Sequence, residues 1–293
     1  MKPSPISPRT ATLLAAETDT NNLPAVLPQL SHLLSHSPNL HQAFLSHPST
    51  PQIWKLFPTE GQWCGYRNLQ MLLLALPSIL PPTSPVLQKN EFLKTKLTIP
   101  HLQLLIETAW DQGFNAHSRD QLGGRLVGTT TFIGTPEAEA LLLSLGVPCT
   151  GRVFKSPEAW IELLDSVEEY FASSSSLSAP PGRDQVKTDS EICPLQRGKE
   201  VRVISTTRPP IFLQRPGHSM AIIGLSRSTS GKRHLLVFDP AWSPPSALRR
   251  RGVGVELGCG ECEGWAAKWM LRQYRKGGRY LGRWREFETV SVD

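Results

Sequence analysis

Three residues with catalytically useful side chains lie at the edges of apolar runs. Cys64 opens the segment that leads into the apolar run 69–76, and His218 opens the apolar stretch 220–225. Asp239 closes a third apolar run, 235–238. A thiol, an imidazole and a carboxylate together activate a sulfur nucleophile for attack on a carbonyl carbon. The pattern therefore indicates nucleophilic catalysis by Cys64, provided that the fold brings the three side chains together.

The predicted position of Cys64 favours a reactive thiol. A free cysteine has a pKa near ~8.5, and a helix N-terminus or a neighbouring imidazolium lowers that pKa. Residues 64–76 are apolar almost all round, which predicts a buried helix that begins at the cysteine. Cys64 is thus expected at the positive end of a helix.

A hairpin is expected to place His218 beside Asp239. His218 begins the predicted strand 218–225, and Asp239 ends the predicted strand 234–239. The polar connection 226–232 contains a glycine, as an antiparallel hairpin requires. The carboxylate of Asp239 can then accept from the imidazole of His218 and favour its cationic form.

Acyl transfer also needs hydrogen-bond donors for the oxyanion of the tetrahedral intermediate. The backbone N–H of Cys64 is one candidate. The side-chain amide of Gln62 is the second, although only Trp63 separates it from the nucleophile. The predicted site therefore comprises Cys64, His218, Asp239 and Gln62.

Each residue also has an ordinary structural explanation when it is considered alone. A cysteine beside a buried helix is often a small core residue, and a histidine at a strand end is often only a hydrogen-bonded polar group. An Asp-Pro step after a strand commonly starts a turn. The joint placement of the three residues is what favours catalysis.

No metal or cofactor is expected. The segment 259–262 (CGEC) has the spacing of a metal or redox motif, but no second cysteine or histidine pair follows it. It is interpreted as a surface loop. Cys149 and Cys193 lack an obvious partner and are expected to be structural.

Composition favours a soluble protein of the cytoplasm or nucleus with reduced thiols. The chain has 293 residues, five scattered cysteines, and no N-terminal pattern of a signal peptide. Its most apolar run, 69–80, is shorter than the about 20 residues that span a bilayer, so no membrane partner is expected.

The net charge of +6 is concentrated near the C-terminus, in the arginines 249–251 and in the segment 272–285. Aromatic residues interleave with the basic ones in the second segment, as in some nucleic-acid-binding surfaces. An amphipathic helix that packs on the core explains the pattern equally well, so nucleic-acid binding is considered unlikely.

The predicted elements form an α+β pattern, with helices first and mainly antiparallel strands later. Residues 1–22 are predicted to be a disordered tail and 23–60 a helical extension, with two short helices broken near residue 38. Residues 61–293 are predicted to be one domain, with a flexible Ser-rich insertion at 173–190. Within it we expect helices at 100–111, 135–145, 156–171 and 261–275, and strands at 147–154, 201–206, 211–214, 218–225, 234–239 and 286–292.

Three segments resemble the peptidase family that contains the proteases of the ubiquitin-fold modifier and the zinc-finger-containing ubiquitin peptidase. They are 64–71 (CGYRNLQM), 125–134 (RLVGTTTFIG) and 209–219 (PPIFLQRPGHS). The resemblance covers about residues 61–292. It implies a papain-like cysteine protease fold in which Cys64 is the nucleophile, His218 the base and Asp239 the residue that orients it.

The order of the catalytic residues resembles the ubiquitin-cleaving branch of that family. Proteases of the ubiquitin-fold modifier place aspartate and histidine together in an Asp-Pro-His motif, whereas here Asp239-Pro240 is followed by Ala241. The resemblance therefore implies a compact, fungal-type deubiquitinase, without zinc fingers, that prefers lysine-sixty-three-linked polyubiquitin.

Two alternatives remain open: a protease of the ubiquitin-fold modifier and a non-catalytic ubiquitin-binding module on the same fold. In either enzyme, loops near Trp242 and Arg125 are expected to line a narrow channel for the modifier tail.

Overall fold

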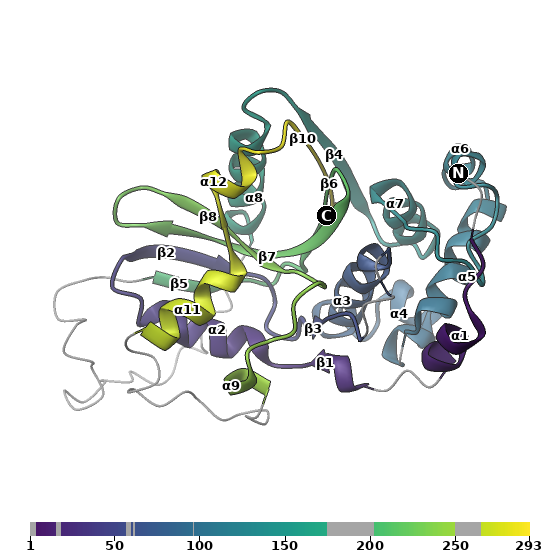
Figure 1. The fold of residues 1–293 in the computed structure, drawn as a ribbon, viewed down its shortest axis with the longest axis horizontal. Coiled ribbons are helices and arrows are strands. Elements are labelled where there is room, and N and C mark those ends of the chain that lie inside the picture. The colour runs from purple at the N-terminus through teal and green to yellow at the C-terminus, as the bar shows by residue number, and fades with distance from the viewer. Residues whose placement is uncertain are drawn as a thin grey trace.

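The computed structural model contains one large, twisted sheet with helices packed around it (Figure 1). This arrangement confirms the α+β class. The structure describes residues 4–15, 19–56, 60, 62–95, 97–174, 202–249 and 265–293.

The helices and strands of the described chain have the following bounds. The α-helices are α1 (Pro8–Ala15), α2 (Val26–Ser35), α3 (Cys64–Ile79), α4 (Pro85–Lys89), α5 (Ile99–Asp111), α6 (Ala116–Gln121), α7 (Thr135–Ser144), α8 (Ala159–Ala172), α9 (Ser246–Arg249), α11 (Trp265–Tyr274) and α12 (Gly278–Leu281). The strands are β1 (Asn22–Leu23), β2 (Leu40–Leu45), β3 (Gln52–Ile53), β4 (Cys149–Lys155), β5 (Arg202–Ser205), β6 (Ile211–Arg215), β7 (His218–Ser228), β8 (Arg233–Phe238), β9 (Arg275–Gly277) and β10 (Glu286–Val292).

The main sheet has eight strands, in the order β4-β10-β6-β7-β2-β5, with β8 pairing β7 and β9 pairing β8. All pairs are antiparallel except β2 with β5, which run parallel. Strands β7 and β8 form the predicted hairpin, with Ala221 opposite Phe238 and Arg227 opposite Arg233. The start of β7 and the end of β8 therefore lie side by side at the open end of the hairpin.

Helices cover both faces of this sheet. Alternation along β8 directs Leu236 and Phe238 into the apolar cluster under α2 and α11, and Leu235 and Val237 into the cluster under α8. Strand β7 alternates in the same way until its register shifts between Ile222 and Gly224. A bulge of this kind changes which face the following side chains meet.

A third apolar cluster holds the helical part of the molecule together. It joins α3, α5 and α7 with the ends of β6 and β10, and these helices lie at one end of the sheet (Figure 1). Helix α3 also packs against β7, with Met71 reaching the cluster under α2. These contacts fix the N-terminus of α3 beside the start of β7.

The N-terminal part differs from the sequence prediction. Residues 1–22 were expected to be disordered, but Pro8–Ala15 form α1, whose Leu14 is buried in the cluster around α3. Composition alone predicted disorder here, whereas burial of Leu14 against the cluster around α3 accompanies the helix.

The segment 23–60 also differs, because it is not a purely helical extension. Helix α2 is present, but Leu40–Leu45 form β2, inside the main sheet between β7 and β5. Ala43 and Leu45 face the cluster under α2, whereas Phe44 packs on the opposite side. The spacing of Leu40 and Phe44 suggested a helix, and pairing with β5 and β7 determines the strand instead.

The later elements agree with the prediction. The expected helices at 100–111, 135–145 and 156–171 correspond to α5, α7 and α8, and the expected strands correspond to β4, β5, β6, β7, β8 and β10. Most of the predicted insertion 173–190, the cysteine at 193 and the CGEC segment 259–262 lie outside the described residues. Among the described residues, no helix is both long and apolar enough to cross a membrane.

Candidate active site

Cys64 is the first residue of α3, as predicted. The buried Trp63 precedes it, and the Trp63 N–H donates to the Glu60 carbonyl at 3.1 Å. Close packing holds this helix start in place, since a Cβ on Gly65 would lie 2.6 Å from the carbonyl oxygen of Ile133. Backbone N–H groups in the first turn have no acceptor within the helix. The N–H of Cys64 is therefore available to an oxyanion, and the helix dipole favours negative charge on the sulfur.

His218 and Asp239 meet at the edge of the β7–β8 hairpin. The His218 Nε2 lies 2.8 Å from Asp239 Oδ1, and both side chains are largely buried. The backbone N–H of Ala241 donates to the same carboxylate oxygen at 3.0 Å. Because Nε2 is engaged with Asp239, Nδ1 is the ring nitrogen left for the thiol.

Contacts with His218 and Ser219 lower the pKa of Cys64. Burial alone would raise it, but hydrogen bonds with these two residues and the positive charge of His218 bring the pKa of Cys64 to about 7. The cysteine and the histidine are therefore hydrogen-bonding neighbours. The structure brings Cys64, His218 and Asp239 together in one site.

The pKa of His218 moves in the opposite direction. Burial lowers it, but hydrogen bonds and charge interactions with Asp239 and Cys64 outweigh burial and raise the pKa to about 9. The thiol thus loses its proton at a lower pH than the imidazolium. Between these two values the favoured state is a thiolate beside an imidazolium.

Asp239 is kept ionised in its buried position. Burial raises its pKa. The hydrogen bond and charge of His218, the N–H of Ala241 and the charge of Lys276 lower the pKa by more than burial raises it, so the net shift is downward. The Lys276 Nζ lies 4.0 Å from Asp239 Oδ2. A carboxylate in this state holds the ring of His218 and stabilises its cation.

A chain of two hydrogen bonds connects the buried Asn68 to the Cys64 thiol through Ser219. The Asn68 side chain, one helical turn after Cys64, donates to Ser219 Oγ at 3.0 Å. Ser219 in turn hydrogen-bonds Cys64. Asn68 and Ser219 both lie in the segments that resemble the peptidase family, but sequence reasoning assigned them no role.

A fully buried ion pair anchors the loop before Cys64. Arg67 Nε donates to Glu60 Oε2 at 3.0 Å, Arg67 Nη2 donates to Glu60 Oε1 at 3.1 Å, and both side chains are 0% exposed. The N–H of Leu56 also donates to Glu60 Oε1, at 2.9 Å. Sequence reasoning missed this pair. Its only signal is an arginine within an otherwise apolar buried helix.

Gln62, the predicted second oxyanion donor, lies in the turn before α3 with an exposed side chain. Its role stays a prediction. Trp242 is 56% exposed just beyond Asp239, and Phe132 is 43% exposed beside the Ile133 that packs on Gly65. Arg125 is also exposed. The expected channel for the modifier tail, lined by loops near Trp242 and Arg125, stays a prediction.

The second described cysteine has different surroundings. Cys149 begins β4, and burial, followed by the negative charges of Glu139 and Asp293, raises its pKa to about 12. Among the described residues, no group of three or more His, Cys, Asp or Glu side chains is placed to hold a metal ion.

Residues 39–290 of the chain match the family described as Peptidase family C78. The chain belongs to Peptidase family C78. The resemblance inferred from the three motifs is thereby confirmed. The match begins at β2 and so includes part of the segment that was predicted to be an extension.

Curated relatives are consistent with membership of this C78 family. The "Zinc finger-containing ubiquitin peptidase 1" of Bos taurus is 32% identical over 197 residues, which are 63% of this chain and 28% of the relative. The "Ubiquitin carboxyl-terminal hydrolase mug105" of Schizosaccharomyces pombe is 31% identical over 184 residues, 62% of this chain and 60% of the relative. The chain thus spans only part of the length of these relatives.

A solved structure, "Crystal structure of UfSP from C.elegans", is also similar to this C78 chain. The TM-score is 0.41 at 13% sequence identity, covering 83% of this chain and 32% of the other.

Proposed function

We propose that this C78 peptidase is a deubiquitinating thiol protease that uses Cys64, His218 and Asp239. It cleaves the isopeptide or peptide bond after the Gly-Gly tail of ubiquitin, with lysine-sixty-three-linked polyubiquitin as the preferred substrate. The observation that carries the proposal is the arrangement of the thiol at a helix N-terminus, an imidazole whose Nε2 is 2.8 Å from a carboxylate, and the resulting order of the two pKa values.

The proposed reaction has two steps. The Cys64 thiolate attacks the carbonyl carbon of the terminal glycine, and the C–N bond breaks as imidazolium Nδ1 of His218 gives its proton to the departing amine. Water then attacks the thioester while neutral His218 accepts a proton. This releases the glycine carboxylate and restores the thiolate–imidazolium pair.

Three further groups stabilise charge without forming or breaking covalent bonds. Asp239 keeps the Nε2–H of His218 directed toward itself, which leaves Nδ1 facing the sulfur. The backbone N–H of Cys64 and the amide of Gln62 are the proposed donors to the oxyanion. Removal of one such donor typically slows an enzyme by about 10²–10³.

Ubiquitin is favoured over the ubiquitin-fold modifier by the order of the site residues. The histidine precedes the aspartate in the chain, and Asp239-Pro240 is followed by Ala241 instead of histidine. The names of two curated relatives, both of which contain the word "ubiquitin", also support this choice. The linkage preference rests on the resemblance to the ubiquitin-cleaving branch, and a cytoplasmic or nuclear location is proposed because the nucleophile must remain a reduced thiol.

Electrophilic probes test this proposal. Ubiquitin with a C-terminal electrophile should label the wild-type chain and not Cys64→Ala, and the probe built on the ubiquitin-fold modifier should label it much more slowly. Stronger labelling by the second probe would transfer the assignment to that modifier. Binding of ubiquitin with an unreactive Cys64 would instead favour a non-catalytic module. A panel of differently linked diubiquitins, with His218→Ala as the control, decides the linkage.

A further inference from the structure

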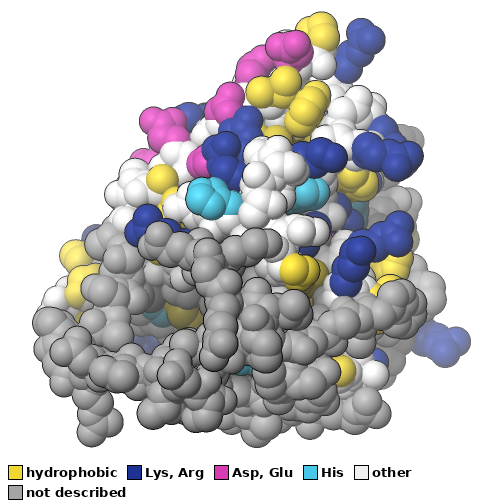
Figure 2. Space-filling view, turned by 90° about the vertical axis from the view of Figure 1, so that its left-hand side faces the viewer, with side chains coloured by type: hydrophobic (Ala, Val, Ile, Leu, Met, Phe, Trp, Pro, Cys, Tyr) yellow, Lys and Arg dark blue, Asp and Glu magenta, His cyan; other side chains and the backbone are white. Residues whose placement is uncertain are grey.

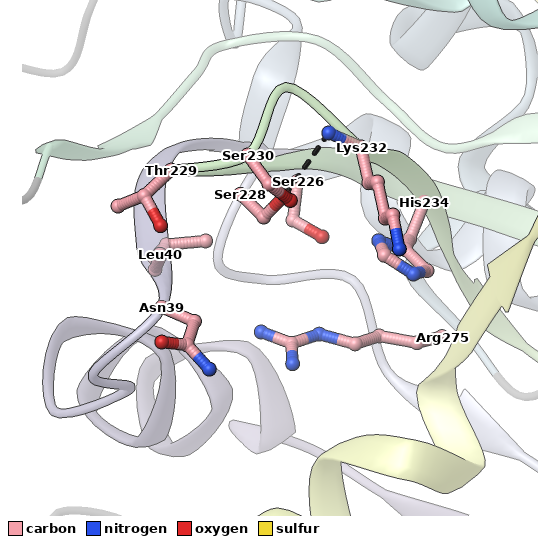
Figure 3. Close-up of a pocket in the computed structure, with 9 residues that line it drawn as sticks. All are labelled: Asn39, Leu40, Ser226, Ser228, Thr229, Ser230, Lys232, His234 and Arg275. Carbon is pink, nitrogen blue, oxygen red and sulfur yellow. Dashed lines mark hydrogen bonds between the residues drawn. The ribbon is translucent and has the colours of Figure 1, made fainter.

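A polar pocket of about 440 Å³ lies at the turn of the β7–β8 hairpin, at the opposite end of the hairpin from His218 and Asp239. Figure 3 shows the residues that line it. It is enclosed by the hairpin turn, the residues just before β2 and the first residue of β9. Its lining contains Lys232, His234, Arg275, the amide of Asn39 and several hydroxyl groups, and the described residues that line it include no aspartate or glutamate. The pocket is therefore rich in donors and positively charged.

Among the described residues, no acidic side chain lines this pocket beside Arg275. Its guanidinium extends across the space toward Asn39 (Figure 3), and its Nε is buried without a hydrogen-bond partner in the described part of the chain. Burial lowers the pKa of this arginine. A buried guanidinium N–H without an acceptor is costly, and an anion in the pocket would offset that cost.

His234 responds to the same excess of positive charge. Burial lowers its pKa, and the charges of Arg275 and Lys232 lower it further. The adjacent Gly277 makes this packing possible, because a Cβ there would lie 2.6 Å from the His234 ring. Lys232, His234 and Arg275 are thus held close together although they repel one another.

The positive surface continues into a second pocket of about 800 Å³. Lys232, His234 and Arg275 line both pockets, and the second adds further basic side chains, Arg272, Lys276, Arg279 and Arg283. Lys and Arg side chains lie on both sides of the histidines at the centre of this face, and acidic side chains lie along its upper left flank, next to some of the basic ones (Figure 2).

The nearest acids on the covering helix α8 are already paired. Asp165 lies 2.5 Å from Arg233, and Glu168 pairs with both Arg227 and Arg233 at 2.5 and 3.0 Å. They leave Lys232 and Arg275 without an acidic partner among the described residues.

We propose that these two pockets form a binding site for a small ligand that carries two or more phosphate groups. The forked guanidinium of Arg275 suits a phosphate oxygen pair, and Lys232, Asn39 and the serine hydroxyls supply single donors around it. A second phosphate would lie among the arginines of the larger pocket. The site is independent of the proposed protease activity.

The surroundings favour a small ligand over single-stranded nucleic acid. A nucleic-acid surface needs open aromatic faces on which bases stack. Here Lys276 lies 4.9 Å and Arg215 5.8 Å from the centre of the Tyr280 ring, and a Cβ on Gly278 would contact the Trp160 ring at 3.1 Å. Both aromatic residues that line this site therefore already have ring contacts within the protein.

Calorimetric titration of the full chain with tripolyphosphate and with pyrophosphate tests the proposal. We expect saturable binding at one site, with orthophosphate much weaker because one phosphate engages only one pocket. Lys232→Gln and Arg275→Gln should each weaken binding by roughly tenfold or more, since each removes a charge-assisted donor. Lys155→Gln, which removes an exposed charge from β4, is the matched control and should change binding by less than about twofold.

Three results would overturn the proposal. They are the absence of saturable binding, binding that both pocket variants leave unchanged, and a single-stranded oligonucleotide that binds more tightly than tripolyphosphate through the same residues. Lys232 is exposed, so Lys232→Gln decides the question if Arg275→Gln fails to fold.

Discussion

Cys64 and Cys149 are both partly buried thiols in the described chain, and the charges around them have opposite signs. Cys64 faces His218 and begins a helix, whereas Cys149 begins a strand near Glu139 and Asp293. Burial raises the pKa of both thiols. The neighbours then bring the pKa of Cys64 down to about 7 and leave that of Cys149 at about 12.

Burial therefore does not decide which of the two thiols is easily deprotonated. The distinguishing feature is a positively charged partner that is itself held by a carboxylate. For Cys64 that partner is His218, and Asp239 keeps it cationic.

Removal of the two thiols should have very unequal effects. Cys64→Ala eliminates the sulfur that forms the thioester, so cleavage of diubiquitin should fall to background. Cys149→Ala should retain activity within about twofold, because exposed or half-buried sites away from chemistry tolerate small changes. Both are measured by gel-based cleavage of diubiquitin, and full activity in Cys64→Ala would refute the choice of nucleophile.

Removal of the imidazole should shift the pKa of Cys64 upward, toward that of Cys149. His218→Ala deletes the general acid and the positive charge together, so kcat/KM should fall by about 10²–10⁴. The pKa of Cys64 should also rise, because burial would no longer be opposed by His218. Steady-state kinetics measures the loss, and a change of less than about threefold would exclude His218 as the general acid.

The ion pair behind the nucleophile should matter for stability rather than for chemistry. Arg67→Ala leaves the Glu60 carboxylate buried without its partner, which should lower the free energy of unfolding by about 3–5 kcal/mol. Arg152→Ala on β4, where the arginine is exposed, should change it by less than about 0.5 kcal/mol. Urea unfolding followed by tryptophan fluorescence compares the two, and equal effects would contradict the proposed anchoring role.

Among the changes at the site, Asp239→Asn should have the smallest effect on the rate. Its main effect should be on the shape of the plot of kcat/KM against pH. In the wild type, kcat/KM should rise as Cys64 loses its proton near pH 7 and fall as His218 loses its proton near pH 9. Without the carboxylate charge the pKa of His218 falls, so the alkaline limb should move to lower pH and the maximum should drop by about tenfold. An alkaline limb that stays in place would show that Asp239 does not hold the imidazolium.

Local sequence pattern was sufficient to predict the elements that position the site. The apolar run after Cys64 predicted α3, and the alternation around residues 218–239 predicted the β7–β8 hairpin with His218 and Asp239 at one edge. Both signals are local, because burial of one helix or strand is reflected in neighbouring residues.

The missed features depend on long-range pairing. Residues 40–45 became β2 because two strands that follow far along the chain flank them. The Glu60–Arg67 pair and the contact from Asn68 to Ser219 are buried polar interactions, which a sequence pattern does not distinguish from exposed polar residues. The cluster of Lys232, His234 and Arg275 likewise forms only when β9 pairs with β8.

The central claim is that Cys64 is a thiolate stabilised by His218, and the pH dependence of alkylation tests it most directly. Iodoacetamide labelling of the wild-type chain, resolved by peptide mass spectrometry, follows Cys64 and Cys149 in one sample. The account predicts that labelling of Cys64 rises through a midpoint near pH 7, that His218→Ala moves this midpoint upward, and that Cys149 stays unlabelled throughout. A Cys64 midpoint at the ordinary thiol value, unchanged by His218→Ala, would contradict it.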